Sequence, residues 1–363
     1  MKRALIAMSG GVDSSLAAKL MQDEGYECIG CTMKLYQNAD AGLERSRTCC
    51  SLEDVEDARS VAYDLGMRYY VFNFTDDFRD TVIRRFVESY QNGITPNPCI
   101  DCNRFMKFGK LFDRAKILDC DCVVTGHYAR IEQQDGRYVL KKAIDTTKDQ
   151  SYVLYAMTQD QLAHTRFPLG NLRKAHVRAL AEQYGFVNAD KPDSQDICFV
   201  PNGDYASVIE LQTGRRAAPG SFVDRSGRVL GMHRGLIHYT IGQRKGLGIS
   251  ADAALYVCDI CPQNNTVVLG KSADLFSTEA DAMDFHWISG ECPKHAIRCK
   301  AKIRYRQQEQ WATVVPCGDH DVHILFDDPQ RAITPGQAAV LYDGDIVLGG
   351  GTIRAQKSAG TEI

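Results

Sequence analysis

Two cysteine-containing segments carry the residues best suited to covalent chemistry. The first is NPCIDCN at residues 97–103, which holds Cys99 and Cys102, and the second, DSQDICFVP, holds Cys198. Both are loop-like and lie near expected helix or strand ends, where functional residues concentrate. A helix beginning near Asn103 would place Cys102 at an amide-rich N-terminus, which favours the thiolate form.

A segment rich in glycine and serine, MSGGVDSS at residues 8–15, could bind an anion. It follows an apolar run at 4–7 that predicts a buried strand, and it precedes a helical pattern that ends near Gly25. Glycines allow close backbone approach, and the unpaired amides of a helix start point at negative charge. An ordinary strand-to-helix turn with a Ser or Asp cap is the alternative. The segment is not a Walker A loop, because it lacks G-x-x-x-x-G-K-[ST].

Other interpretations of the paired cysteines are less favoured. A structural zinc site at Cys99 and Cys102 would need a second pair, and Cys258-x-x-Cys261 lies far along the chain in a β-rich region. A redox C-x-x-C pair fits poorly with a sheet that already carries an anion-binding loop. Of the 14 cysteines in the chain, several are expected to be buried small apolar residues. These are Cys28, Cys31, Cys120 and Cys122.

Length and composition indicate a globular protein of more than one domain. The chain has 363 residues, of which 44% are hydrophobic and 25% charged, so two or three domains are expected. No apolar run reaches the length of a membrane span and no signal-peptide pattern is present, so we expect a cytoplasmic protein with no membrane partner. The net charge of −3 argues weakly against a nucleic-acid partner, although a local basic surface would suffice for one.

The elements that must position these segments alternate between strand and helix. Such alternation predicts an α/β fold with a doubly wound parallel sheet, whose ligand lies beyond the carboxyl ends of the strands. The loop at 8–15, Met33 and the turn at 125–127 should therefore converge. The expected strands are residues 27–34, 67–72 and 122–125, and the expected helices are residues 52–65, 78–90 and 107–118.

The second half of the chain has a different texture. Asp135-Gly136 between alternating apolar flanks predicts a hairpin, and helices are expected at 154–162 and 174–184. From about residue 221, short β-rich runs punctuated by Gly, Asp and Asn predict a small β-rich module and then a C-terminal β-barrel. We expect domains at 1–205, 206–280 and 281–363.

Ten blocks of residues, in order, resemble one family. SGGVDS at 9–14 is similar to the PP-loop of the ATP pyrophosphatase superfamily, whose members split ATP into AMP and pyrophosphate. Together the blocks resemble the tRNA-specific 2-thiouridylases, which thiolate the wobble uridine of certain tRNAs. The others are residues 49–51 with Asp54 and Asp57, and residues 95–98, 102–103, 125–130, 148–152, 194–199, 239–248, 304–306 and 334–337.

The resemblance implies an enzyme that adenylates the C2 oxygen of uridine and then replaces that oxygen with sulfur. It implies that Cys198 carries the sulfur as a persulfide and that Cys102 resolves it, with a disulfide between them as the product. ATP and Mg²⁺ are the implied cofactors. The residues expected to hold ATP are Ala7, Met8, Ser9, Gly10, Gly11, Val12, Asp13, Ser14, Met33 and Gly126.

The resemblance also implies two partners, the anticodon region of tRNA and a protein that donates persulfide sulfur, for a chain expected to be a monomer. Arg304-Tyr305-Arg306 combines cations with a base-stacking ring, as RNA recognition requires. On its own His127 suits a core histidine, Lys148 a solvated charge, and the glycine-rich block at 239–248 either a phosphate-binding loop or a β-turn cluster. The implied RNA contacts are His127, Lys148, Asp149, Gln150, Tyr305, Arg306 and Gln337, and the implied target-base loop is Asn97, Pro98 and Cys99.

One departure from the family pattern concerns residues 97–103, the thiol segment, which holds Cys99 and Cys102. Many members carry Asp-x-x-Cys, with the Asp as a general acid or base, where this chain has Cys99. Asp101 or an ordered water could take that role. The departure also opens an alternative in which Cys99, Cys102 and Cys198 ligate a [4Fe–4S] cluster that carries the sulfur. The persulfide route is preferred.

Two other classes of function compete with thiolation. Another PP-loop adenylating synthetase would not need Cys102 or Cys198. A noncatalytic RNA-binding protein with the same fold would release neither pyrophosphate nor AMP.

Overall fold

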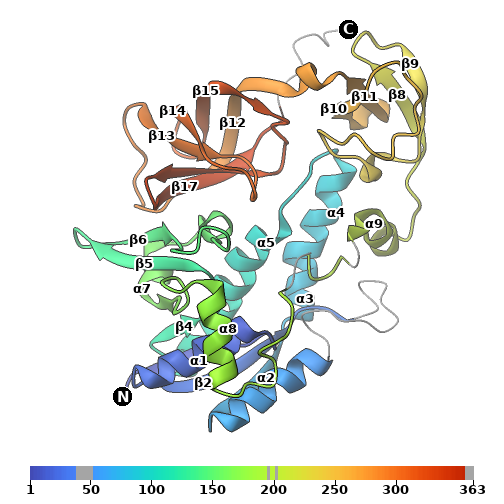
Figure 1. Ribbon diagram of the computed structural model, residues 1–363. Helices are drawn as coiled ribbons and strands as arrows, with labels where there is room; N and C mark the ends of the chain where they lie inside the picture. The colour runs from blue at the N-terminus through green and yellow to red at the C-terminus, as the bar shows by residue number, and fades with distance from the viewer. Residues whose placement is uncertain (38–51, 194–196, 201–202, 356–363) are drawn as a thin grey trace.

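The computed structural model describes residues 1–37, 52–193, 197–200 and 203–355. Figure 1 shows a helix-covered sheet at the bottom, a barrel above it and a smaller sheet beside the barrel, with α4 and α5 running between the lower and upper parts. No helix among the described residues is long and apolar enough to span a membrane.

The lower sheet is parallel throughout, in the order β3-β2-β1-β4-β7. Side chains of β1 alternate between its faces, so that Ala4 and Ile6 pack against α1, α2 and α8 while Leu5 packs against α6. Both faces are therefore covered, and the predicted doubly wound sheet is confirmed. The strands are β1 (Arg3–Ala7), β2 (Glu27–Lys34), β3 (Arg68–Asn73), β4 (Cys122–Val124) and β7 (Thr165–Arg166), and the helices are α1 (Val12–Asp23), α2 (Leu52–Asp64), α6 (Leu111–Ile117) and α8 (Lys174–Gln183).

Two composite helices lie beyond the sheet, each interrupted by a π-helical segment. The first joins α3 (Thr75–Phe78) to α4 (Arg84–Gln91), and the second joins α5 (Pro98–Asp101) to α6 through residues 102–110. The second begins at Pro98, well before the expected start. Asn97 accepts a hydrogen bond from the Cys99 amide and Pro98 takes the first helical position, so Cys102 lies more than a turn inside the helix. The prediction that Cys102 occupies the helix N-terminus is wrong.

The expected helix at 154–162 is also wrong. A 3₁₀ turn at Ser151–Leu154 is followed by a separate helix, α7 (Gln159–Ala163). Thr158 and Gln161 form a capping box that starts this helix afresh.

The middle of the chain forms a small module. After α9 (Tyr205–Thr213), four strands pair in the order β10-β11-β8-β9 around a core that includes Phe222 and Val267. The strands are β8 (Gly220–Asp224), β9 (Val229–His233), β10 (Tyr256–Cys261) and β11 (Thr266–Gly270).

The C-terminal strands close into an antiparallel barrel, as predicted. The order β12-β15-β14-β13-β16-β17 returns to its start because β12 also pairs with β17. The hairpin of β5 (Ala129–Gln134) and β6 (Arg137–Lys142) forms around Asp135-Gly136 and adds to the barrel sheet, where Lys141 pairs with Ile346. The strands are β12 (Phe276–Trp287), β13 (Ile297–Lys302), β14 (Gln310–Pro316), β15 (Val322–Arg331), β16 (Ala338–Asp343) and β17 (Ile346–Ile353).

Candidate active site

The turn between β1 and α1 presents backbone amides at the carboxyl edge of the sheet. Gly11 precedes the helix and has no side chain to cap it, so the first helical amides are available to an anion. Gly10 has φ +74°, and a Cβ there would lie 2.4 Å from the Asp54 carbonyl oxygen. The Ser14 hydroxyl accepts a hydrogen bond from the Ser9 amide at 3.2 Å and so holds the turn closed. This geometry suits phosphate.

The loop after β4 reaches the same amides. A Cβ on Gly126 would lie 2.9 Å from the Ser14 nitrogen, so only glycine allows this approach. Met33 is the last residue but one of β2, the strand on the other side of β1. The predicted nucleotide-binding segments therefore lie at one edge of the sheet.

An ion-pair network that the sequence analysis missed supports this edge. Lys174 binds Asp13 at 2.7 and 2.8 Å and Asp193 at 2.7 Å, and it is only 8% exposed. The Tyr128 hydroxyl also donates to Asp13, at 2.8 Å. Burial alone would raise the pKa of Asp193, but hydrogen bonds from Lys148 and Lys174 lower it overall. Asp13 is thus a structural partner of lysine rather than an open carboxylate.

A second set of missed contacts braces the loop from behind. Asn188, which is buried, donates to the Gly10 carbonyl at 2.9 Å and to the Ser15 hydroxyl at 3.0 Å. Lys191 binds Asp54 and Asp57, both at 2.6 Å. In the sequence, Asp54 and Asp57 belong to one of the family blocks, and nothing in the neighbouring residues indicates that Lys191 is their partner.

The two candidate sulfur-transfer residues pack against the same apolar cluster. Cys102 and Cys198 both contact this cluster, whose core includes Phe78, Phe86 and Phe199. Met33 at the end of β2 contacts it as well, and Tyr36 donates a hydrogen bond to the Cys198 carbonyl at 2.5 Å. Both cysteines are partly exposed. The fold thus brings two residues that are 96 positions apart in the sequence to one cluster.

The four cysteines expected to be structural have environments that favour the neutral thiol. Burial raises the pKa of Cys28 to about 12 and those of Cys120 and Cys122 to about 11, and it also raises that of Cys31. Three of them are buried and Cys120 is partly exposed. They are therefore poor nucleophiles. The predicted burial is confirmed for Cys28, Cys31 and Cys122, but not fully for Cys120.

Cys99 and Asp101 have different surroundings from Cys102. Cys99 is exposed on α5 and lies within electrostatic range of Tyr305. Burial raises the pKa of Asp101, against the opposing effect of Arg85, whose guanidinium lies 3.4 Å away. Asp101 lies between Cys99 and Cys102, and a carboxyl whose pKa is raised can hold a proton and donate it as a general acid.

No three His, Cys, Asp or Glu side chains of the described residues are grouped as a metal ion would require. Cys99, Cys102 and Cys198 are all described, and the three thiols form no such group. The same holds for Cys258 and Cys261 as part of a zinc site.

His127 is enclosed by the protein. Its Nε2 lies 3.3 Å from Lys107 Nζ, which can only donate, and its Nδ1 lies 2.6 Å from the Thr125 hydroxyl. Burial, with the charge of Lys107 adding to it, holds the pKa of His127 well below its usual value. The imidazole is neutral with the proton on Nδ1, and its contact with RNA stays a prediction.

The residues at 148–150 have partners within the chain. Lys148 binds Asp193 at 2.7 Å, and Asp149 accepts from the Ser151 hydroxyl at 2.8 Å. Gln150 accepts from the Tyr128 amide at 2.9 Å. Through these contacts, residues 148–150 form part of the loop that holds Tyr128. The implied contacts of these residues with RNA stay a prediction.

Of the residues at 304–306, Arg304 has hydrogen-bond partners within the chain, whereas Tyr305 and Arg306 lie at the surface. The Arg304 guanidinium donates to the Ile241 carbonyl at 3.2 Å and to the Thr334 hydroxyl at 2.5 Å, so it joins the small module to the barrel. Tyr305 and Arg306 are exposed. Burial raises the pKa of Tyr305, and so do the nearby Asp149 and Cys99. Tyr305 thus lies near both Cys99 and Asp149, which is another implied RNA contact.

Gln337 belongs to a barrel loop that contacts the thiol segment. Its side-chain amide donates to the carbonyl oxygens of Thr95, at 2.9 Å, and Pro96, at 3.3 Å. The Thr95 amide in turn donates to the Pro335 carbonyl at 3.0 Å. The barrel therefore holds the chain that leads into α5.

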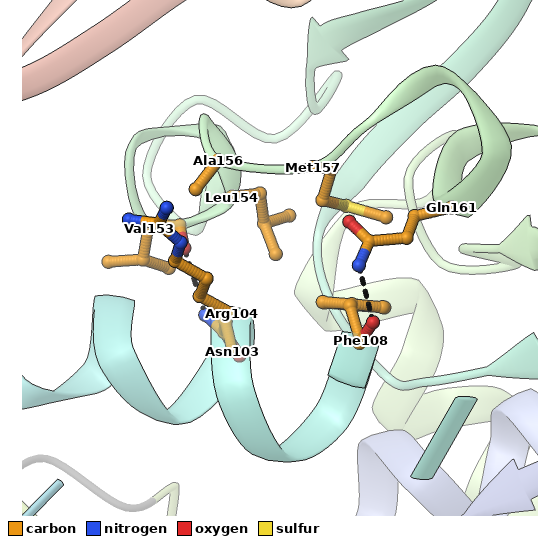
Figure 2. Close-up of a pocket in the computed structure, with 8 residues that line it drawn as sticks. All are labelled: Asn103, Arg104, Phe108, Val153, Leu154, Ala156, Met157 and Gln161. Atoms are coloured by element: carbon orange, nitrogen blue, oxygen red, sulfur yellow. Dashed lines mark hydrogen bonds between the residues drawn. The ribbon is translucent and has the colours of Figure 1, made fainter. Parts of the chain in front are cut away.

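A narrow gap, too small to hold a water molecule, lies between the helical segment at 102–110 and residues 153–161 (Figure 2). Two side-chain amides bridge it: Asn103 donates to the Val153 carbonyl at 3.0 Å, and Gln161 donates to the Phe108 carbonyl at 2.5 Å. Asn103, adjacent to Cys102, fixes the helix that carries the thiol.

Some residues of the family blocks, namely 49–51, with Cys49 and Cys50, and 194–196, lie outside the described residues.

Three family models match the chain in succession. A "tRNA methyl transferase HUP domain" model matches residues 2–202, a "tRNA methyl transferase PRC-barrel domain" model residues 210–271, and an "Aminomethyltransferase beta-barrel domain" model residues 277–353.

Curated relatives match at high identity over nearly the whole chain. The "tRNA-specific 2-thiouridylase MnmA 1" of Thermoanaerobacter sp. (strain X514) is 51% identical over 354 residues, which cover 97% of each chain. The "tRNA-specific 2-thiouridylase MnmA" of Clostridioides difficile (strain 630) is 49% identical over 97% of this chain and 98% of its own.

Two solved structures with detectable similarity have low sequence identity to this chain. A 4-thiouridine synthetase–RNA complex with bound ATP has 16% identity and a TM-score of 0.36, and covers 59% of this chain and 54% of its own. The U34-tRNA thiolase NcsA from Methanococcus maripaludis, with its [4Fe–4S] cluster, has 17% identity and a TM-score of 0.35, and covers 59% of this chain and 66% of its own.

Proposed function

This chain belongs to the tRNA-specific 2-thiouridylase family, and we propose that it thiolates C2 of the wobble uridine in tRNA, with ATP as the activating substrate, Cys198 as sulfur carrier and Cys102 as partner thiol. The descriptions of the family models name methyl transfer instead. The curated relatives decide between the two, because about half of their residues are identical over 97% of the chain.

The packing of Cys102 and Cys198 against one apolar cluster carries the proposal. Sulfur transfer between two thiols requires that they meet, and a shared cluster beside the carboxyl edge of the sheet provides the place. The nearby edge offers the amides of α1 and the close approach of Gly126, both suited to nucleotide phosphates.

The first step activates the base. The uridine C2 oxygen attacks the α-phosphorus of ATP, the bond to the β-phosphate oxygen breaks, and pyrophosphate leaves. The adenylated oxygen then leaves as AMP, which is a far better leaving group than the original carbonyl oxygen. The amides at 12–14 stabilise the phosphate charge that develops.

The second step transfers sulfur. The terminal sulfur of a Cys198 persulfide attacks C2 and displaces AMP. The Cys102 thiolate then attacks the Cys198 sulfur, which breaks the S–S bond, releases 2-thiouridine and forms a Cys102–Cys198 disulfide. An external dithiol supplies the two electrons that restore both thiols. A persulfide-donating protein reloads Cys198.

The residues present fit magnesium only as a companion of ATP. Asp13 is bound to Lys174 and Asp54 to Lys191, so these carboxylates are engaged with lysine. Magnesium would be held mainly by the phosphates and water, as is usual for this ion. Cys99, Cys102 and Cys198 form no group that could hold a metal ion, and no step is assigned to a [4Fe–4S] cluster.

Asp101 is the residue we assign to proton transfer at the base. It lies on the same turn of helix as Cys99, which occupies the family's acid position, and burial raises its pKa. Tyr305 and Arg306, exposed near Cys99, are proposed to contact the anticodon loop. A monomeric state and a cytoplasmic location complete the proposal.

The test separates the two chemical steps. With unmodified tRNA, ATP and a persulfide donor, Cys198→Ser should release pyrophosphate yet form no 2-thiouridine, which nucleoside analysis by mass spectrometry measures. Cys317→Ser, at an exposed barrel position, is the matched control and should behave as wild type.

Formation of 2-thiouridine by Cys198→Ser would refute the assignment of the sulfur carrier. The protein is prepared anaerobically for these assays, and its iron content is measured. The iron content distinguishes the persulfide route from the route through a [4Fe–4S] cluster. Stoichiometric iron that is required for activity would overturn the persulfide mechanism.

A further inference from the structure

The outer face of the barrel carries a row of cations on β13. Cys299 and Ala301 of this strand are 2% and 1% exposed and point into the barrel core. Because side chains alternate along a strand, Arg298, Lys300 and Lys302 share the opposite face, about 7 Å apart along the strand. The row therefore lies on the outer face of β13, the strand that pairs with β14 in the barrel of Figure 1.

Trp311 on β14 lies directly across from Lys300 in the antiparallel register. Its ring is 51% exposed, with the Arg298 guanidinium 5.2 Å and the Lys300 Nζ 5.5 Å from the ring centroid. The other tryptophan of the chain, Trp287, is buried in the barrel core. A large aromatic side chain between two cations, left in solvent, is characteristic of nucleic-acid-binding surfaces.

The row of cations is continuous with the thiol segment. Lys302 Nζ lies 5.6 Å from the ring centroid of Tyr152 and 5.9 Å from that of Tyr305. Tyr305 is within electrostatic range of Cys99 on α5. A strand of RNA with its target base at the thiol segment would meet Lys302 first, then Lys300 and Trp311.

The charge on this face matches a polyanion. Asp327 binds Arg298 at 2.7 Å, and Glu309 binds Lys142 at 2.5 Å and lies within electrostatic range of Lys300. The salt bridge to Asp327 holds the Arg298 guanidinium beside the ring of Trp311. Asp149 also lies near Lys302, so four cations, namely Arg298, Lys300, Lys302 and Lys142, face three carboxylates, although the whole chain carries −3.

We infer that the outer face of β13 and β14 binds the tRNA strand that leads away from the target uridine, with Lys300 at a phosphate and Trp311 stacked on an unpaired base. This inference rests on the proposed function, because it takes tRNA as the occupant. It adds a contact surface outside the residues implied by the family resemblance.

Tryptophan fluorescence tests the inference directly in the full-length protein. The chain has two tryptophans, and Trp311 is the accessible one. Saturating unmodified tRNA should protect the emission of the wild type from quenching by acrylamide. In Trp311→Phe the remaining emission comes from Trp287, and tRNA should not alter its quenching.

Binding measurements on variants give a second readout. Trp311→Ala should weaken tRNA binding by about tenfold, and Trp311→Phe should restore most of it, because a stacked base contributes roughly that much. Lys300→Ala should reduce the slope of log K against log salt concentration by about 0.7–0.9, the effect of one lost phosphate contact. Lys2→Ala removes one exposed charge at the distant N-terminus and should leave the slope unchanged.

The outcomes separate this inference from the proposed function. If wild type binds tRNA but Trp311 stays fully accessible and Lys300→Ala retains the slope, the surface is not a tRNA contact and the inference is wrong. If wild type binds no tRNA at all, the proposed function itself fails.

Discussion

Gly10 shows how one residue type determines whether the nucleotide loop can form. Its φ of +74° is unfavourable for any residue with a side chain, and the space where a Cβ would project is already occupied by the backbone of Asp54. This contact holds the loop against the start of α2, so the anion site can form only when residue 10 has no Cβ.

Gly10→Ala is expected to lower the free energy of unfolding by about 2–4 kcal/mol and to abolish measurable ATP binding, because strain and a backbone clash add. Urea unfolding and calorimetric titration with ATP measure the two effects. Gly25→Ala is the matched control: Gly25 has φ +85°, but nothing lies within 4 Å of its Cβ position. It should cost only about 1–2 kcal/mol and leave ATP binding intact. Equal losses in both variants would show that the clash with Asp54 is unimportant.

Asp101 is a carboxylate whose charge is unfavourable in the folded state. Burial is the main cause of its raised pKa, and the partly opposing Arg85 is itself about half exposed. Because the folded state holds the proton more tightly than the unfolded state, Asp101 reduces stability as the pH rises above its usual pKa of 3.8.

Asp101→Asn is therefore expected to be more stable than wild type at pH 7, and the difference should disappear as the pH falls below 3.8, where both folded and unfolded chains hold the proton. Urea unfolding at a series of pH values measures it. Asp64→Asn, at an exposed position of α2, controls for the loss of one negative charge. A variant less stable than wild type at neutral pH would mean that the Arg85 pair outweighs the burial of the charge.

At the scale of elements, the segment that leads into α5 is held from two sides. Asn97 caps the helix locally, and the barrel loop at 335–337 binds the backbone of Thr95 and Pro96 through Gln337 and Pro335. The helix that carries both thiols of the segment thus takes its position from a barrel residue more than 240 positions away in sequence.

Gln337→Ala should lower kcat for thiolation by about fivefold, with KM for tRNA within about twofold of wild type, since one hydrogen bond that positions the loop contributes about 1 kcal/mol. Steady-state kinetics with varied tRNA measures both constants. Gln263→Ala, on the exposed surface of the small module, should change neither. A rise in KM at unchanged kcat would instead identify Gln337 as a direct RNA contact.

At the scale of the whole molecule, the barrel and the parallel-sheet domain are joined by more than a linker. The β5–β6 hairpin leaves the N-terminal half to pair with β17, and Arg130 of the hairpin binds Asp345 at 2.5 Å. Tyr152, completely buried, donates from its hydroxyl to the Ala338 carbonyl of β16 at 2.8 Å. We expect the two parts to unfold together.

Tyr152→Phe should lower the free energy of unfolding by about 1–3 kcal/mol, because the Ala338 carbonyl loses its buried partner. Both tryptophans belong to the barrel, so fluorescence reports on it, while circular dichroism at 222 nm reports on the helices of the N-terminal half. The two signals should change at the same urea concentration in wild type and variant. Tyr63→Phe, 82% exposed on α2, should be neutral. Separate transitions would show that the interface does not couple the domains.

Much of the fold could be predicted because its determinants are local. The alternation of strands with helices that stop at glycine, such as Gly25, indicated the parallel sheet, and Asp135-Gly136 indicated the hairpin. The start of α5 is equally local, since Asn97-Pro98 is a cap followed by a residue suited to the first helical position, whereas the apolar pattern further along predicts a later start.

Only the tertiary structure decided which distant parts meet. A strand's sequence specifies which of its faces is buried but not which edge will pair with it, so the docking of β6 on β17 could not be inferred. In the same way, the thiol residues gave no local indication that they would share a cluster, nor Gln337 that it would face Thr95 rather than solvent. Periodicity and caps act within a few residues, whereas these contacts depend on how whole layers pack.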